Sequence, residues 1–210
     1  MTTAAELLGT RAAEDSPAFL FEDRAWSYRA LVEEAGRRAG FFEELRDSSR
    51  PPHIGVLLDN VPEYLFWLAA AALSGTVVVG INSTYRGDQL GQLIRHSDCQ
   101  VLVTSSDQLG LLDGVDTQVS SDRVLVVDRG GYETAVAQHN PVLTSAPVAE
   151  EDLFLLIFTS GSTGLPKAVR CTQGRFGRTG RHVAGIAQLG ENDVVYSPLP
   201  FFHSSSLFTG

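Results

Sequence analysis

A loop rich in glycine and hydroxyl side chains lies within residues 157–169, which read IFTSGSTGLPKAV. Phosphate groups are held well by backbone N–H groups, hydroxyls and one cation that converge on a single concavity, and glycine lets the backbone approach closely. Lys167 supplies the cation, and Pro166 stiffens the approach to it. The remaining contributors are Thr159, Ser160, Gly161, Ser162, Thr163 and Gly164. The stretch therefore predicts a phosphate-binding loop.

Other loops of similar composition fit this stretch less well. A Walker A loop ends in Gly-Lys-Ser/Thr at the start of a helix, whereas Lys167 follows a proline and precedes an expected strand. A nucleophile elbow needs the spacing GxSxG, but Gly161 and Gly164 are too close together. A plain Gly/Ser surface turn would have no need of a lysine. The residues thus favour a phosphate loop of another kind.

The elements that must position this loop alternate between short apolar strands and helical patterns from His53 onward. This rhythm is typical of stacked βα units on a largely parallel sheet, so we predict an α/β fold. The expected strands are residues 53–59, 76–81, 100–104, 123–128, 152–158, 168–171 and 193–200. The expected helices that follow them begin at Pro62, at Gly87 and at Gln173.

Other parts of the chain predict a hairpin, two helix caps and a linker. Residues 18–23 and 24–28 predict a hairpin, after which Ser27 would cap a helix running to about residue 46. Asn60 is a candidate cap for the helix that begins at Pro62. Residues 139–150 contain two prolines and little periodicity, so they predict a linker.

Residues 64–81 carry no charge and reach the length of about 18 residues that a membrane-spanning helix needs. Ser74 and Gly75 interrupt this stretch, and the β-branched run after them is typical of a buried strand. We therefore predict a helix and a strand within a soluble fold, while peripheral membrane association stays open.

The overall composition narrows the classes of partner. The chain has 210 residues, is 43% hydrophobic and has a formal net charge of −9, so broad contact with nucleic acid or an anionic membrane is disfavoured. Cys99 and Cys171 show neither disulfide-framework nor zinc-ligand spacing, which fits a cytoplasmic protein. The N-terminus lacks the pattern of a signal peptide. The expected partners are small molecules, and no metal site is expected, even around His96.

The segment TSGSTGLPK, residues 159–167, resembles the phosphate-binding signature of the adenylate-forming superfamily, which includes acyl-CoA synthetases, luciferases and peptide-synthetase adenylation domains. Residues 26–31, 71–82 and 198–207 are similar to other stretches of that family in the same order. Residues 167–176 resemble the fatty-acid-transport and very-long-chain acyl-CoA synthetase branch. The resemblance thus extends over the whole chain and implies part of the large N-terminal domain of the acyl-CoA synthetase fold.

The resemblance implies a fatty-acid CoA ligase that uses ATP, Mg²⁺ and coenzyme A. The acid attacks the α-phosphate of ATP to give an acyl-adenylate, and the thiol of coenzyme A then displaces AMP. Thr159 to Gly164 and Lys167 would surround the β- and γ-phosphates, and Lys167 and His203 would take part in catalysis, with His203 near the carboxylate and acyl pocket. A histidine simply packed beside Phe202 is the alternative reading.

Later motifs of the family are missing from these residues: the acidic motif for magnesium, the aspartate for the ribose and the lysine of the C-terminal lid domain. We therefore expect residues 1–210 to be an N-terminal portion, inactive alone, whose cut sheet could favour self-association. A non-catalytic nucleotide-binding module, and activation of a steroid or aryl acid, remain alternatives. The arginines Arg175, Arg178 and Arg181 are expected on a solvated helix face rather than in a coenzyme A clamp.

Overall fold

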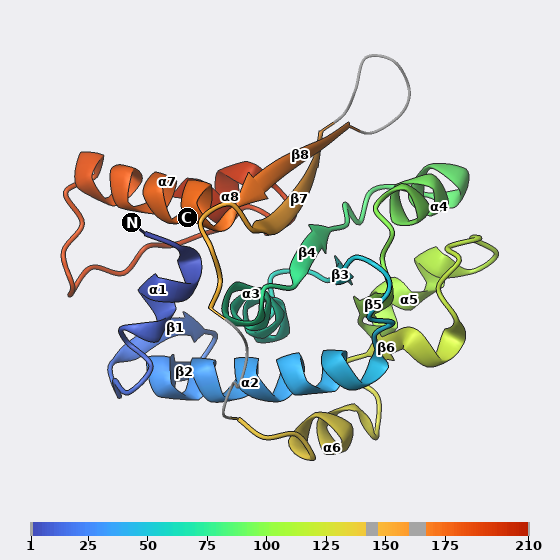
Figure 1. Ribbon diagram of the computed structural model, residues 1–210, viewed down its shortest axis with the longest axis horizontal. Helices are drawn as coiled ribbons and strands as arrows, with labels where there is room; N and C mark the ends of the chain where they lie inside the picture. Colours follow the sequence, from blue (N-terminus) through green and yellow to red (C-terminus); the bar gives the residue numbers. More distant parts are fainter. Residues whose placement is uncertain (1, 142–146, 160–166, 210) are drawn as a thin grey trace.

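The computed structural model describes residues 2–141, 147–159 and 167–209, and its centre is a six-stranded sheet with helices on both faces (Figure 1). The strand order is β6-β5-β3-β4-β7-β8, and neighbouring strands run parallel except for the antiparallel pair β7 and β8. The strands are β3 (His53–Leu57), β4 (Val77–Gly80), β5 (Val101–Thr104), β6 (Val124–Val126), β7 (Leu153–Thr159) and β8 (Lys167–Thr172). The predicted α/β class with a largely parallel sheet is confirmed.

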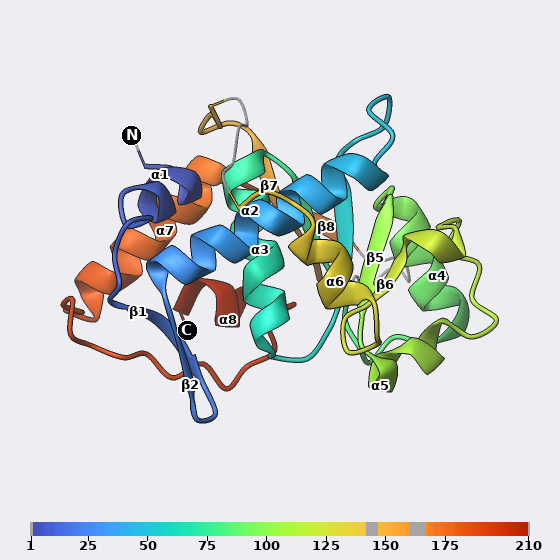
Figure 2. The same cartoon turned by 90° about the horizontal axis from the view of Figure 1, so that it is seen from below.

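Alternate residues of the central strands pack on opposite faces of the sheet, as the two-residue period of a strand requires. In β4, Val78 packs with the cluster that includes Trp67, whereas Val77 and Val79 pack with Leu93 on the other face. The first face is covered by α2 (Tyr28–Leu45), α3 (Pro62–Ser74) and α6 (Tyr132–Ala137), and the second by α4 (Gly87–His96) (Figure 2).

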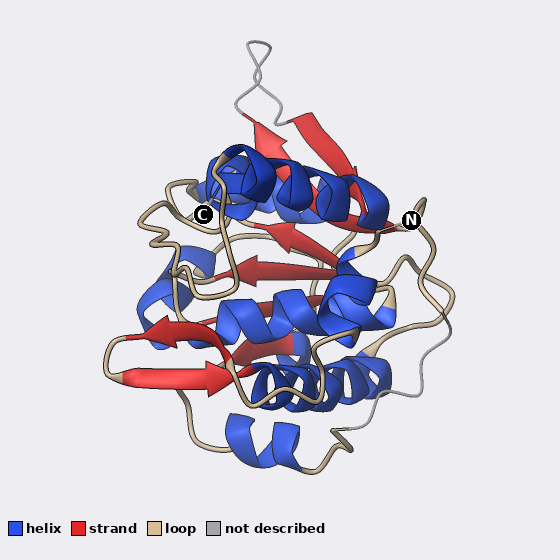
Figure 3. Cartoon of the chain, turned by 90° about the vertical axis from the view of Figure 1, so that its left-hand side faces the viewer, coloured by secondary structure: helices blue, strands red, loops and turns tan. Residues whose placement is uncertain are grey.

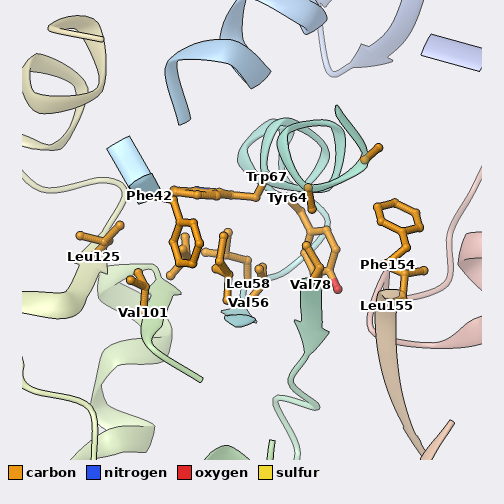
Figure 4. Packing of buried hydrophobic residues seen from close by; sticks show 14 of the residues in the cluster. Phe42, Val56, Leu58, Tyr64, Trp67, Val78, Val101, Leu125, Phe154 and Leu155 are labelled. Atoms are coloured by element: carbon orange, nitrogen blue, oxygen red, sulfur yellow. The ribbon is translucent and has the colours of Figure 1, made fainter. Parts of the chain in front are cut away.

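The core under α3 is built from large side chains that are almost fully buried. Figure 4 shows Phe42, Tyr64 and Trp67 above Val56 and Val78 of the sheet. Each large apolar side chain removed from water in this way contributes about 1.5–3 kcal/mol. This packing fixes α3, and with it the loop that joins β3 to α3, on the sheet.

A two-stranded hairpin precedes the main sheet, as predicted. It consists of β1 (Pro17–Phe21) and β2 (Arg24–Ser27), which pair antiparallel and lie apart from the main sheet (Figure 3). The Ser27 side chain accepts a hydrogen bond of 3.2 Å from the backbone N–H of Ala30, so it caps α2. A short helix, α1 (Ala4–Gly9), lies at the start of the chain.

The uncharged stretch at residues 64–81 forms most of α3 and all of β4. Gly75 ends α3 with a φ of 75°, a left-handed conformation that glycine adopts without strain. The predicted helix and strand are therefore confirmed. Within the described ranges, no helix is long and apolar enough to cross a membrane.

The C-terminal part differs from the prediction at one element. After β8, the chain forms α7 (Gln173–Ile186), and α8 (Ser204–Thr209) follows an irregular segment. The strand expected at residues 193–200 is wrong: these residues belong to no helix or strand, and Tyr196 is 85% exposed. Pro198 and Pro200 have no N–H to donate to a ladder, and no described strand lies beside this segment as a partner.

The remaining short elements are α5 (Ser106–Leu109), the 3₁₀ turn Gly110–Leu112 and the 3₁₀ turn Ser121–Arg123, all between β5 and β6. The linker predicted at 139–150 falls partly outside the described residues, because residues 142–146 are not among them.

Candidate functional site

The predicted phosphate loop lies between β7 and β8. Thr159, the last residue of β7, is the register partner of Lys167, the first residue of β8, and the Lys167 side chain is exposed. The residues predicted to cradle the phosphates, Ser160 to Gly164, lie outside the described residues, as does the side chain of Thr159. Lys167 opens a strand rather than a helix, so the arrangement is not that of a Walker A loop.

The end of β7 and the start of β8, which flank the predicted loop, lie at the edge of the sheet where the parallel strands end. β7 runs parallel to β4, with Gly80 opposite Ile157, and the loop starts shortly after Ile157. From the same edge, the chain leaves β3 toward α3 on one face and leaves β4 toward α4 on the other. Such a switch point at the carboxyl ends of parallel strands is where open α/β sheets bind their ligands.

Asn60, in the loop after β3, reaches across this edge to the C-terminal segment. Its side-chain Nδ2 donates to the carbonyl of Leu199 at 2.8 Å, and its Oδ1 accepts from the N–H of Phe201 at 2.9 Å. The prediction that Asn60 caps α3 is wrong, because Val61 occupies the N-cap and no side-chain hydrogen bond is made there. The amide instead binds the backbone on both sides of Pro200.

His203 follows directly on this clamped segment. Its backbone N–H donates to the carbonyl of Pro200 at 3.0 Å, and its ring lies 4.5 Å from the ring of Phe202, centroid to centroid. Phe202 is buried, whereas the His203 side chain is exposed. The backbone of Phe202 is so close to Gly80 that a Cβ on that glycine would lie 3.1 Å from its Cα. His203 is therefore held near the carboxyl end of β4, next to the strand that leads into the loop.

Tyr64 lies beneath the same segment with an unpaired hydroxyl. The side chain is 1% exposed, and its oxygen has no hydrogen-bond partner among the described residues (Figure 4). Burial raises the pKa of this hydroxyl above its ordinary value, so it stays protonated. A Cβ on Gly80 would lie 3.1 Å from this oxygen, and the ring centroid of Phe201 lies 5.3 Å from that of Tyr64. The first turn of α3 thus supports the segment from below.

The arginines of α7 lie on an exposed face, as expected. Arg178 makes an ion pair of 2.9 Å with Glu150, and Arg175 donates to the backbone carbonyl of Arg170 at 3.4 Å. Arg178 is 62% exposed at its side chain, so its charge is largely solvated. Nothing in these contacts assembles a phosphate clamp.

The carboxylate and thiol side chains near His96 are engaged in other contacts. Asp98 is paired with Arg50, and Cys99 is buried against Ser97 at 3.2 Å. Burial raises the pKa of the Cys99 thiol to about 12, which disfavours the thiolate that a metal would need. In the part of the chain that the structure describes, no group of three His, Cys, Asp or Glu side chains could hold a metal ion.

A hollow of about 300 Å³ lies at the opposite end of the sheet, between α2, β6 and α6. Its lining includes the apolar side chains of Phe41 and Leu125 and also Arg129. β6, which lines this hollow, lies at the opposite end of the strand order from β7 and β8. The candidate site is therefore the edge near β4 and β7 rather than this hollow.

Sequence reasoning did not identify Asn60 or Tyr64 as parts of the site. The available signal was the position of Asn60 directly after a buried strand, at the edge where the phosphate loop was also expected. That signal was assigned to helix capping because Pro62 follows. The contact of Asn60 with a segment 139 residues away could not be read from local sequence.

Comparisons with known proteins agree on one family. The family described as "AMP-binding enzyme" matches residues 9–210. The steroid-22-oyl-CoA synthetase of Rhodococcus jostii (strain RHA1) is 41% identical over 210 residues, which cover 98% of this chain and 37% of that protein. The medium/long-chain-fatty-acid–CoA ligase FadD17 of Mycobacterium tuberculosis is 36% identical, over 99% of this chain and 40% of that protein.

Solved structures share the fold. A putative long-chain-fatty-acid CoA ligase from Rhodopseudomonas palustris superposes with a TM-score of 0.85 at 21% identity, over 98% of this chain and 53% of that one. ATP-bound MatB from the same organism gives a TM-score of 0.81 at 20% identity, over 100% of this chain and 42% of that one. The chain thus spans well under half the length of the curated relatives named above.

Proposed function

This chain belongs to the AMP-binding enzyme family, and on that premise we propose that it forms part of an AMP-forming acyl-CoA synthetase acting on a hydrophobic carboxylic acid. The observation that carries the proposal is the position of the two strand ends that flank the predicted loop. The end of β7 and Lys167 at the start of β8 lie at the carboxyl edge of the parallel strands, and the sequence between them is rich in glycine and hydroxyl side chains. The relatives named acyl-CoA synthetases and ligases support this assignment.

In the proposed reaction, a carboxylate oxygen of the acid attacks the α-phosphorus of ATP. A bond forms between this oxygen and the phosphorus, the bond from the α-phosphorus to the bridging oxygen breaks, and pyrophosphate leaves with the electron pair. Negative charge develops on the leaving pyrophosphate, so donors and a cation near the β- and γ-phosphates accelerate the step. Lys167 and the residues Thr159 to Gly164 are proposed to supply them. The thiol of coenzyme A then gives up its proton to the solvent and its sulfur bonds to the acyl carbon, the bond from this carbon to the phosphate oxygen breaks, and AMP leaves with the electron pair.

His203 is proposed to lie beside the carboxylate of the acid. Its exposed ring packs against the ring of Phe202 near the end of β4, which is the neighbour of β7, the strand that leads into the loop. No carboxylate cluster for magnesium is formed within the described ranges. We therefore propose that Mg²⁺, where it accompanies ATP, is held by the phosphates and by groups outside those ranges.

The acid is proposed to be either a fatty acid or the side-chain acid of a steroid. The relative at 41% identity is named for steroid-22-oyl-CoA synthesis, and the relative at 36% for medium- and long-chain fatty acids. The site of action is proposed to be the cytoplasm, where ATP and coenzyme A are available.

The test is acid-dependent exchange of labelled pyrophosphate into ATP, measured on the full-length protein that contains this chain. Fatty acids of several lengths, aryl acids and steroid side-chain acids form the panel, and acyl-CoA is detected by mass spectrometry. We expect exchange with at least one of these acids and acyl-CoA after addition of coenzyme A. Binding of ATP without exchange for any acid would instead favour a non-catalytic nucleotide-binding module.

A further inference from the structure

Asn60 makes a two-point contact with the backbone of a segment far away in sequence. Its amide donates to Leu199 and accepts from Phe201, so it pairs with the chain around Pro200 as a neighbouring strand residue would. Pro200 itself has no N–H. Both hydrogen bonds have normal lengths, 2.8 and 2.9 Å, and each joins an N–H donor to an oxygen acceptor.

This contact is made instead of a helix cap. An asparagine cap stabilises a helix by about 1 kcal/mol relative to alanine, yet the N-cap position of α3 is Val61, which makes no such bond. The Asn60 side chain is therefore committed to the distant segment. The side chain of its neighbour Asp59 has a different partner: it accepts a hydrogen bond of 3.0 Å from Gln108.

The segment that Asn60 holds has few other attachments. Residues 193–200 form no ladder with the described strands, and Val194, Tyr196 and Leu199 are exposed. Within this segment, Ser197 also shares a hydrogen bond of 2.8 Å with Ser206. At Pro200 the chain is therefore held by the Asn60 amide, and directly after it by the packing of Phe201 on Tyr64 and of Phe202 on Gly80.

The turn at Pro200 also positions the backbone of His203. The backbone N–H of His203 is bonded to the carbonyl of Pro200, the residue that Asn60 brackets on both sides. A shift of Pro200 thus moves the His203 backbone directly. Phe202, held against Gly80, fixes the other side of this turn.

We propose that Asn60 is a positioning residue of the acid-activating site: it holds the turn at Pro200 so that the His203 side chain faces the acid at the sheet edge where β4 and β7 end. This inference rests on the proposed function. Without the amide, the turn loses both bonds to the β3–α3 loop, and the His203 ring is displaced relative to the sheet edge. Displacements of about 1 Å at a reacting centre can lower rates by about a hundredfold.

The test is a double-mutant cycle on the full-length enzyme, with acid-dependent pyrophosphate exchange as the readout. Asn60→Ala is expected to lower kcat/KM for the acid by about ten- to a hundredfold. In the background of His203→Ala, the same Asn60→Ala change is expected to cost less than about threefold, because Asn60 acts through His203. Asp59→Ala, from the same loop, is the matched control and should stay within about twofold of wild type.

A purely structural Asn60 would lower activity by the same factor in both backgrounds, and this result would overturn the inference. So would an Asn60→Ala enzyme with unchanged kcat/KM. A wild-type enzyme without any exchange would refute the proposed function itself, which separates the two failures.

A second variant and a second measurement cover the case in which Asn60→Ala does not fold. Asn60→Asp keeps an acceptor for the Phe201 N–H but turns a carboxylate toward the Leu199 carbonyl, so it should lower kcat/KM in the same direction. Hydrogen exchange of the Phe201 amide should accelerate in Asn60→Ala, which removes its acceptor, and exchange of the His203 amide should accelerate in either variant; neither should change in Asp59→Ala. Unchanged exchange at these amides would overturn the inference independently of catalysis.

Discussion

Replacing Glu63 with alanine removes the carboxylate at the centre of a buried polar network between α2, α3 and α6. Arg38 donates to Glu63 through Nε at 2.6 Å and through Nη2 at 2.5 Å, and the side chains of Arg38 and Glu63 are 6% and 13% exposed. The Tyr132 hydroxyl also donates to Glu63 and accepts from Trp67 Nε1 at 3.0 Å. Burial lowers the pKa of Arg38, but the hydrogen bonds and charge of Glu63 outweigh this effect and keep the guanidinium charged.

The expected cost follows from what the change leaves behind. Breaking a buried ion pair by removing one partner costs about 3–5 kcal/mol, since the remaining charge is buried without compensation. The Tyr132 hydroxyl loses its acceptor as well, which costs about 1–3 kcal/mol for a buried donor. Arg38 keeps its contact with Glu34, whose side chain is 36% exposed, and this offsets part of the loss. We therefore expect Glu63→Ala to lower the free energy of unfolding by about 4 kcal/mol.

Urea unfolding of the purified full-length protein, followed by circular dichroism, measures this loss. The matched control is Glu34→Ala, which removes the more exposed partner of the same arginine and should cost about 1 kcal/mol or less. The double variant Arg38→Met with Glu63→Gln should recover most of the stability, because it leaves no buried unpaired charge and retains an acceptor for Tyr132; Glu34, which loses its partner, is 36% exposed and solvated. A cost of Glu63→Ala equal to that of Glu34→Ala would refute the reasoning that burial of Arg38 dominates.

Three further predictions concern the site and the fold. Lys167→Ala should lower acid-dependent pyrophosphate exchange by about thirtyfold or more, equivalent to about 2–4 kcal/mol, with little change in acid binding; Arg170→Ala on the same strand is the control, and equal effects would contradict the assignment. The free energy of unfolding should fall as the pH rises from about 9 toward about 12, because burial raises the pKa of Cys99 to about 12 and raises the pKa values of Tyr64 and Tyr132, so that these groups lose their protons more readily in the unfolded chain. Urea midpoints at a series of pH values check this, and a flat profile would exclude it. Residues 1–210 alone, given ATP, Mg²⁺, coenzyme A and the acid panel, should yield no acyl-CoA above background by mass spectrometry, and multiple turnovers would show that the catalytic groups are misplaced.

The regular elements were predictable because their signals are local. The apolar runs of β3, β4 and β5 alternate with helical periods, Ser27 stands where a helix cap is expected, and Gly75 is a left-handed helix end. These features depend on residues a few positions apart. The family resemblance carried by residues 159–167 is confirmed by the match over residues 9–210. The narrower resemblance to the very-long-chain branch stays a prediction.

The errors occurred where distant residues decide the structure. The apolar pattern at 193–200 predicts a strand, but a strand needs a neighbour to pair with, and sequence alone does not supply one. Asn60 had the residue type and position of a cap, and its actual partners lie near Pro200. The functions of Ser160 to Gly164 remain predictions, because these residues lie outside the described ranges.

The antiparallel pair β7 and β8 is held at two points along its length. At its root, the buried side chain of Gln173 accepts from the N–H of Ala5 at 3.3 Å and donates to the carbonyl of Ala72 at 3.1 Å, while its backbone N–H donates to the carbonyl of Asp152 at 2.9 Å. Nearer the far end, β7 pairs with β4 up to Ile157, which lies opposite Gly80. The last two residues of β7 extend beyond this pairing, over about 7 Å at about 3.3 Å each. A rotation of about 5° there displaces the end of the strand by about 0.6 Å, which is within the roughly 1 Å that catalytic alignment tolerates. The pairing of β7 with β4, rather than the anchor at Gln173 alone, thus sets how accurately Lys167 is positioned.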